Sequence, residues 1–392
     1  MASPVVPFND LRLRFAADPD GYRAAIERVF DRARYILGPE VEAFEAEFAE
    51  YLGGGHAVGV SNGTDAIELA LRAAGIGPGD EVITVAHTAV ATACGIERAG
   101  ARPVFVDISA DDYTIDPKAI PPAVTSRTRA IVAVHLYGQP ARLKELRAVA
   151  DRNRLLLIED CAQAHGARYA GRMVGTFGDL AAFSFYPTKN LGAFGDAGAV
   201  FTRDKALAAR VRRLRNYGQA DRYLHEDAGG FNSRLDELQA ALLRISLQRL
   251  DADNLERQWL ADQYLSRLRV PALPCSRPGT EHAYHLFVVR HPNRDGFCEE
   301  LRRRGVETLI HYPVPVHLQP AYAHLNDRRG DLPVTERAAR EVVSLPLFPG
   351  MTREQQDTVV AATNSAAVME RAVSSLVTAR RSLLDKAVGG SD

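Results

Sequence analysis

Alternation between short apolar runs and helical patterns is the feature that most restricts the fold of this chain. Between about residues 56 and 202, segments such as ARLKELRAVADRNR (141–154) carry apolar residues at three- and four-residue spacing. The runs between them are almost continuously apolar, as strands covered on both faces are. They are HAVGV (56–60), EVITVA (81–86), RPVFVDI (102–108), RAIVAVHLY (129–137), LLLIED (155–160), LAAFSFY (180–186) and AGAVFT (197–202). This pattern predicts an α/β domain with a mainly parallel sheet, joined by an antiparallel strand at the last run.

A long helical pattern follows, from Ser233 to about Leu268, and three prolines then end it. AYHLFVVR (283–290) opens a second region of mixed helix and strand. We therefore predict two domains, a large α/β domain over residues 1–250 and a smaller C-terminal α+β domain over residues 251–392.

Charge and composition exclude several classes of function. The 48 Lys and Arg residues are balanced by 49 Asp and Glu residues, so no basic excess favours binding to nucleic acid. No apolar run approaches the roughly 20 residues that cross a bilayer, and the N-terminus does not resemble a secretion signal. The four cysteines are widely spaced without a CxxC pair, which predicts reduced thiols in a cytoplasmic protein and no metal site.

Two signals for chemistry lie at predicted strand ends, where open α/β sheets bind ligands. Asp160 closes LLLIED and is followed by Gln163, and FSFYPTKNLGAFGDAGA (183–199) places Lys189 in a glycine-rich loop. A carboxylate at the end of an apolar strand needs a cationic partner, and the protonated nitrogen of a pyridoxal ring is one. Lys189 would form the Schiff base with the aldehyde of that cofactor and move protons once released.

A third signal is SNGTDAIELAL (61–71), in which the chain turns through Gly63 into a helix. The free N–H groups and the helix dipole at Thr64 and Asp65 make a seat for a phosphate, to which Ser184 would add a hydroxyl.

Each signal alone has an ordinary structural explanation. SNGTD is equally typical of a helix cap, Asp160 of a turn after a strand, and Lys189 of a solvated loop lysine. Their occurrence together, in this order and all at strand ends, favours a cofactor site.

The motifs SNGTDA, IEDCAQAHGA, FSFYPTKNLGAFGDAGA and GGFNSRLDELQAA together resemble the DegT/StrS family of sugar aminotransferases. The resemblance runs from about Phe8 to SLPLFPGM (344–351), nearly the whole chain. It implies the pyridoxal-phosphate-dependent transferase fold of type I, which is the aspartate-aminotransferase-like fold.

The resemblance also implies roles for individual residues. Lys189 would carry the cofactor, Asp160 would pair with the pyridine nitrogen, and Gln163 would contact the ring hydroxyl. Ser184 and the backbone of Thr64 and Asp65 would hold the phosphate. Asn232 would reach the phosphate of the neighbouring subunit's cofactor, which implies a homodimer with shared active sites.

One segment departs from the family pattern. Many members carry an aromatic residue that stacks on the cofactor ring, where this chain reads VAHTAVAT (85–92) with Ala89. Either His87 or a small residue would cover the ring here. The structural alternative for His87 is a strand-end histidine hydrogen-bonded to the backbone.

A narrower resemblance concerns the substrate. FYPTKNLGAFGDAG, NSRLDELQAA and LIHYPVPVHLQPAY resemble enzymes that aminate C3 of dTDP-linked 3-keto-6-deoxyhexoses with L-glutamate as donor. It places Tyr186, and His311 from the partner subunit, near the sugar. The structural alternatives are a core aromatic for Tyr186 and a turn histidine for His311.

Three other functions stay open at this point. They are amination at C4 of the sugar, a dehydratase of the aminodehydroquinate type on the same fold, and a cofactor-binding regulator without turnover. The intact set of Asp160, Gln163 and Lys189 argues against the regulator.

Overall fold

The computed structural model describes residues 5–367, and at its centre lies a seven-stranded sheet of order β1-β9-β8-β5-β4-β2-β3. Neighbouring strands from β8 to β3 run parallel, whereas β9 is antiparallel to both β8 and β1. The predicted mainly parallel sheet and its antiparallel strand are therefore confirmed. The strands are β1 (His56–Val60), β2 (Glu81–Val85), β3 (Arg102–Val106), β4 (Thr128–Val134), β5 (Leu156–Asp160), β8 (Leu180–Ser184) and β9 (Gly198–Thr202).

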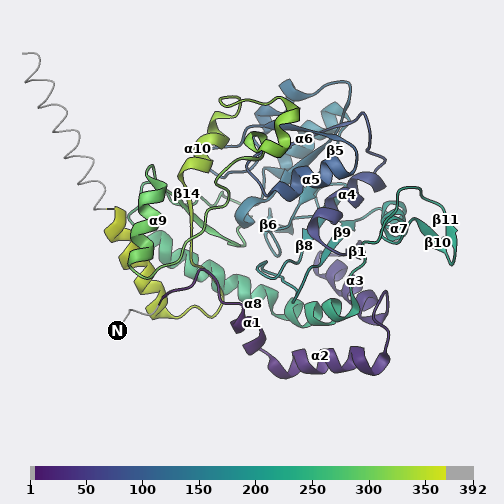
Figure 1. The fold of residues 1–392 in the computed structure, drawn as a ribbon, viewed down its shortest axis with the longest axis horizontal. Coiled ribbons are helices and arrows are strands. Elements are labelled where there is room, and N and C mark those ends of the chain that lie inside the picture. The colour runs from purple at the N-terminus through teal and green to yellow at the C-terminus, as the bar shows by residue number, and fades with distance from the viewer. Residues whose placement is uncertain (1–4, 368–392) are drawn as a thin grey trace, which may run out of the picture.

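Helices cover both faces of this sheet, which is why its strands are apolar on both sides (Figure 1). On one face, alternate strand residues such as Val58 and Val200 pack against α4 (Gly63–Ala73), α5 (Val90–Arg98) and α7 (Lys205–Leu214). On the other face their neighbours pack against α3 (Pro39–Tyr51), α6 (Leu143–Asn153) and α8 (Glu237–Arg267).

The predicted long helix is α8, which has 31 residues. Its first half packs on α3 and on α2 (Pro19–Arg32), and its second half supplies Leu260 and Tyr264 to the C-terminal core. The helix runs unbroken through residue 250, so the predicted domain boundary falls inside one continuous element. The division into two domains stays a prediction, and residues 368–392 of the second domain lie outside the described residues.

The C-terminal part is built around the antiparallel pair of β13 (Phe287–Arg290) and β14 (Val342–Leu345). None of the helices in the described part is long and apolar enough to span a membrane. The remaining named elements are α1 (Arg12–Ala16), η1 (Pro117–Ala119), η2 (Pro121–Ala123), η3 (Leu136–Gly138), β6 (Arg168–Tyr169), β7 (Arg172–Met173), β10 (Gln219–Asp221), β11 (Leu224–His225), β12 (Thr280–Glu281), α9 (Arg294–Arg303), η4 (Val316–Leu318), η5 (Pro320–Leu325) and α10 (Pro333–Glu341).

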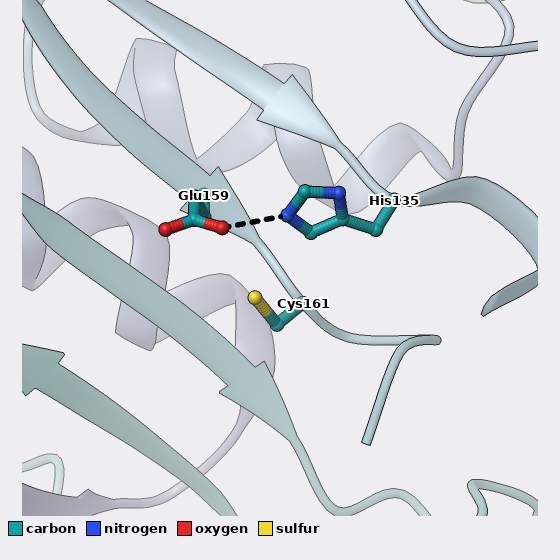
Figure 2. Close-up of side chains that lie close together, drawn as sticks. All are labelled: His135, Glu159 and Cys161. Carbon is teal, nitrogen blue, oxygen red and sulfur yellow. Dashed lines mark hydrogen bonds and ion pairs between the residues drawn. The ribbon is translucent and has the colours of Figure 1, made fainter. Parts of the chain in front are cut away.

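A buried polar cluster of His135, Glu159 and Cys161 lies at the ends of β4 and β5 (Figure 2). Nδ1 of His135 accepts the N–H of Ala141 at 2.9 Å, so Nε2 carries the proton and donates to Glu159 at 3.0 Å. Both ring nitrogens are thus engaged, and the carboxylate of Glu159 also accepts three backbone N–H groups, from Gly175, Phe177 and Gly178. His135 and Glu159 thus form a hydrogen-bond network that ties β5 to the segment 175–178, which precedes β8.

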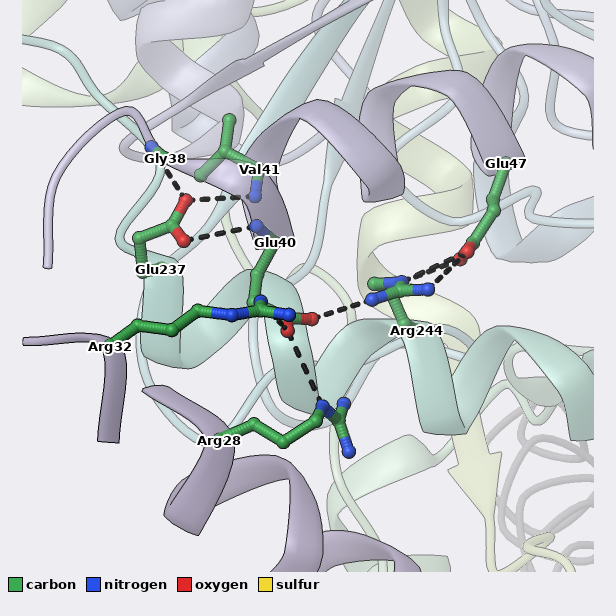
Figure 3. A network of polar contacts seen from close by, with 8 residues as sticks. All are labelled: Arg28, Arg32, Gly38, Glu40, Val41, Glu47, Glu237 and Arg244. Atoms are coloured by element: carbon green, nitrogen blue, oxygen red, sulfur yellow. Dashed lines mark hydrogen bonds and ion pairs between the residues drawn. The ribbon is translucent and has the colours of Figure 1, made fainter. Parts of the chain in front are cut away.

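A second polar network joins α8 to the start of α3 (Figure 3). The buried carboxylate of Glu237 accepts the N–H groups of Gly38, Glu40 and Val41 at 2.8–3.0 Å. Glu237 therefore caps α3 from another helix, because Gly38 at the N-cap has no side chain to do so. The carboxylate of Glu40, which is 1% exposed, pairs with the arginines Arg28, Arg32 and Arg244.

We predict that Glu237→Ala lowers the free energy of unfolding by about 2–4 kcal/mol, because three buried N–H groups at the start of α3 lose a charged acceptor. Urea titration followed by circular dichroism measures the change. The matched control is Glu299→Ala on α9, whose partners are surface arginines and whose loss should leave stability almost unchanged. Equal stability of the two variants would contradict the capping role.

Candidate active site

Two neighbouring strands deliver the central groups of the candidate site. β5 ends at Asp160, and its parallel neighbour β8 ends at Ser184, two residues beyond the partner of Asp160 in the register. The loop after β8 carries Lys189, whose charge acts on Asp160. The structure thus brings together Asp160, Ser184 and Lys189, which the sequence places at separate strand ends.

Asp160 is 4% exposed and its carboxylate has two neutral donors. Thr92 Oγ1 donates to Oδ2 at 2.8 Å, and the N–H of Ala162 donates to Oδ1 at 3.1 Å. Burial raises the pKa of the Asp160 carboxyl above its usual value, and these hydrogen bonds and the charge of Lys189 only partly oppose that shift. The carboxylate is therefore short of positive charge, as a group awaiting a cationic partner would be. Thr92 was missed because it lies on α5, 68 residues before Asp160.

Lys189 is half-buried in its loop. Burial lowers the pKa of its amine to about 8, although the negative charge of Asp160 acts in the opposite direction. A substantial fraction of the amine is consequently neutral at mildly alkaline pH, which is the form that attacks a carbonyl. Lys189 is therefore not the solvated loop lysine that the sequence left as an alternative.

Arg14, on α1, binds the backbone of the lysine loop. Its guanidinium donates to the carbonyl oxygens of Pro187 and Lys189 at 2.6 and 2.8 Å. A Cβ on Gly192 would lie 2.3 Å from Arg14 Nη1 and 2.5 Å from the Pro187 oxygen, so glycine is required for this close approach. Sequence reasoning missed Arg14, which is 175 residues from its partner and belongs to no motif.

The N-terminus of α4 faces Ser184. A Cβ on Gly63 would lie 2.5 Å from the Ser184 Cβ, so only glycine lets the two segments approach so closely. Asn62 caps the helix by accepting the N–H of Asp65 at 2.8 Å, which leaves the N–H groups of Gly63 and Thr64 without a partner among the described residues. The turn is therefore both a helix cap, through Asn62, and a source of two N–H groups that remain available to a phosphate.

The expected contribution of Asp65 to the phosphate seat needs correction. Its N–H is taken by Asn62, and its carboxylate is bound by Arg98, Ser61 and Ser233. Asp65 thus acts as an internal tie between α4, α5 and the segment after Phe231.

Gln163 is oriented by two tyrosines. Its Oε1 accepts the N–H of Tyr137 at 2.7 Å, and its Nε2 donates to the hydroxyl of Tyr312 at 3.3 Å. Burial, followed by the charge of Asp160, raises the pKa of the Tyr312 hydroxyl to about 12, which places Tyr312 in the site. The sequence signal for Tyr312 is its position beside His311 in LIHYPVP, a motif in which the sequence analysis assigns a role to the histidine alone.

His87 has no exposed surface. The Tyr137 hydroxyl donates its proton to the carbonyl oxygen of His311, so His87 Nε2 must donate to that hydroxyl, at 2.9 Å. Burial lowers the pKa of His87 to about 4, so the ring is neutral. His87 thus bonds to a side chain instead of the backbone. Because its imidazole ring has no exposed surface, the small residues of this segment are favoured over His87 as the cover of the cofactor ring.

Tyr186 and His311 lie at the outer part of the site. Tyr186 is 52% exposed, so the alternative of a core aromatic is wrong. His311 is half-buried, with Nδ1 2.8 Å from the hydroxyl of Ser344. Burial, followed by the charge of Lys189, lowers the pKa of His311 to about 4. His311 thus lies near the lysine of its own chain, whereas the resemblance led us to expect it from the partner subunit.

The side chain of Asn232 is exposed and makes no hydrogen bond to the other site residues within the described part of the chain. Its backbone pairs with Asn216, and the adjacent Ser233 is tied to Ser61 and Asp65. The side chain is therefore presented at the surface from a fixed backbone.

Known proteins resemble this chain in both sequence and fold. The model of the DegT/DnrJ/EryC1/StrS aminotransferase family matches residues 20–364. The chain is 53% identical over 356 residues to the dTDP-3-amino-3,4,6-trideoxy-alpha-D-glucose transaminase of Streptomyces venezuelae, covering 90% of this chain and 94% of that protein.

Two crystal structures are similar to this chain over most of their length. DesV of S. venezuelae, in complex with a ketimine intermediate, is 52% identical with a TM-score of 0.91, and the match covers 93% of this chain and 99% of DesV. NtdA of Bacillus subtilis, with the cofactor PMP bound, is 32% identical with a TM-score of 0.88, and the match covers 94% of this chain and 86% of NtdA.

The family model spans most of the chain, and the identity to relatives that align over nearly their whole length is high. This protein belongs to the DegT/DnrJ/EryC1/StrS family of aminotransferases.

Proposed function

We propose that this aminotransferase uses pyridoxal phosphate to move an amino group from L-glutamate to C3 of a dTDP-linked 3-keto-6-deoxyhexose. The observation that carries the proposal is the pair of Asp160, a buried carboxylate in need of a cation, and Lys189, an amine whose pKa is lowered to about 8. The 53% identity to a transaminase of a dTDP-3-amino sugar supports the choice of C3 and of the nucleotide.

The residues of the site fit the cofactor. The unmet charge of Asp160 suits a protonated pyridine nitrogen, and the open N–H groups of Gly63 and Thr64 beside Ser184 suit a phosphate dianion. When bound, the cofactor supplies an electron sink for the substrate carbon. Asp160 would keep the ring nitrogen protonated, and Thr92 fixes the orientation of that carboxylate.

Lys189 would hold the cofactor, and its free amine would be placed to carry a proton at the reacting carbon. Gln163 would contact the ring hydroxyl through Nε2, because its Oε1 is engaged by the backbone of Tyr137. The small residues at 88–89 would cover the ring, and Tyr186 and His311 would bind the sugar.

The enzyme acts as a cytoplasmic homodimer with shared sites. The exposure of Asn232 on a fixed backbone supports its role at the partner's phosphate seat. His311 lies near Lys189 of the same chain, which supports a sugar site in which His311 and Lys189 come from one subunit.

The pH dependence of cofactor capture tests the Asp160–Lys189 pair. The amine must be neutral to attack the aldehyde, and its lowered pKa makes the neutral form available above about pH 8. The rate of covalent capture by apoprotein should therefore rise with pH with a midpoint of about 8, and borohydride should fix the cofactor to Lys189. Asp160→Asn should move the midpoint to lower pH, because the charge that raises the pKa of Lys189 is gone, and should cost several orders of magnitude in amination rate.

Stopped-flow absorbance and peptide mass mapping give the two readouts. Lys205→Ala, at the exposed start of α7, is the control and should behave as wild type. An unchanged midpoint in a folded Asp160→Asn variant, or an adduct on another lysine, would remove the pair from these roles.

The shared site is tested by mixing subunits at limiting cofactor. Lys189→Ala and Asn232→Ala chains should each be inactive alone. Each mixed dimer would hold one site with both groups intact, so random exchange should restore about a quarter of wild-type activity. If mixed dimers form without activity, Asn232 acts in its own chain or not at all.

A panel of dTDP-linked 3-keto and 4-keto sugars with glutamate tests the reaction itself. We expect 2-oxoglutarate and an amino sugar substituted at C3, identified by NMR. A product aminated at C4, or loss of water without amination, would overturn the assignment in favour of the C4 or dehydratase alternative.

A further inference from the structure

The residue that follows Lys189 in the lysine loop is a buried asparagine. Asn190 is 7% exposed, and both polar atoms of its side chain have partners. Its Nδ2 donates to Asn254 Oδ1 on α8 at 2.8 Å and to the carbonyl oxygen of Ala283 at 2.9 Å. Its Oδ1 lies 3.1 Å from Nδ1 of His285, in the segment before β13. Asn190 therefore joins the lysine loop to α8 and to the C-terminal part of the chain.

The partners of Asn190 determine which atoms carry the hydrogens. The carbonyl oxygen of Ala283 can only accept, so the amide atom that faces it must be the NH2 group. The amide oxygen then faces His285, and Nδ1 of that ring must donate. Burial, followed by the charge of Lys189, lowers the pKa of His285 well below its usual value, so the ring is neutral. Within residues 5–367 the ring makes this one hydrogen bond.

The backbone of His285 is held independently of Asn190. Arg257, on α8, donates to the carbonyl oxygen of His285 at 3.5 Å. On the other side, a Cβ on Gly138 would lie 3.1 Å from the backbone nitrogen of His285 and 3.1 Å from the carbonyl oxygen of Gln163. Gly138 has a φ of +95°, so only glycine fits between these two segments. His285 is thus a ring on a fixed backbone, beside the segment that carries Gln163.

We propose that His285 is a positioning residue for Lys189, which it holds in place through Asn190. The inference rests on the proposed role of Lys189 as the residue that carries the cofactor. Without the N–H of His285, the buried Oδ1 of Asn190 has no donor. Asn190 would then turn toward water and move the adjoining backbone, and the amine of Lys189 would become more solvated. Because burial is what lowers the pKa of Lys189, that pKa should rise toward its ordinary value.

The experiment measures covalent capture of pyridoxal phosphate by the full-length apoprotein as a function of pH, with stopped-flow absorbance. The wild-type midpoint is expected at about 8. His285→Leu fills most of the volume of the ring but has no donor, so its midpoint should lie at least about one pH unit higher. His285→Asn leaves more empty space but keeps an N–H where Nδ1 lies, so its midpoint should stay near that of wild type. A role in packing alone predicts the opposite order, because the asparagine variant leaves the larger gap.

A double variant tests whether His285 acts through Asn190. Asn190→Ala should itself raise the midpoint, because the lysine loop loses its ties to α8 and to the C-terminal part. Adding His285→Leu should then change the midpoint little further, since both substitutions remove the same link. His324→Asn, which changes an exposed histidine paired with Glu97, is the control and should behave as wild type.

If circular dichroism shows that His285→Leu does not fold, His285→Gln takes its place, because its amide reaches the position of Nε2 and not that of Nδ1. An unchanged midpoint in the folded variant without the donor, an equal shift in His285→Asn, or additive shifts in the double variant would overturn the proposal. Capture of the cofactor by another lysine in the wild-type protein would instead contradict the proposed function, and peptide mass mapping distinguishes the two failures.

Discussion

The carboxylate of Asp160 lies where a strand buried on both faces ends, and there water cannot solvate its charge. Two neutral donors, from Thr92 and Ala162, orient the group without neutralising it. The negative charge of Asp160 must therefore be balanced by a cation within the active site. That cation is Lys189 in this structure and a protonated pyridine nitrogen in the proposed function. The chemistry of the site depends on this charge, because it attracts a cation and partly opposes the burial that lowers the pKa of the Lys189 amine.

The lysine loop shows how a reactive group is held without regular secondary structure. Lys189 belongs to no helix or strand, so its backbone is fixed by carbonyl contacts to Arg14 and by the absence of a side chain at Gly192. Arg14 in turn belongs to the wall of an adjacent cavity. The position of the amine is thus linked to the packing of α1 against α8, elements far from Lys189 in the sequence.

The tyrosines around the site perform a similar task for its other polar groups. Tyr137 donates to His311 and receives a hydrogen bond from His87, and its backbone N–H orients Gln163. Tyr137, in the segment after β4, therefore connects the strand-end segment at 85–92 with the C-terminal part of the chain. Tyr312 completes the arrangement by bonding to Gln163.

The sequence by itself determined the sheet, because strands that are apolar on both sides need helices on both faces, and it placed Asp160 and Ser184 at strand ends and Lys189 in the loop that follows. It also identified the family, because the motif around Lys189 is long and specific. Only the tertiary structure decided what surrounds these residues. Thr92, Arg14 and Tyr312 reach the site from 68 to 175 residues away, and no local pattern encodes such contacts. The tertiary structure also decided the environment of Asp65 and His87. The carboxylate of Asp65 binds Arg98 and Ser233, and His87 is fully buried. Burial and hydrogen-bond partners depend on packing between elements, which sequence periodicity does not specify.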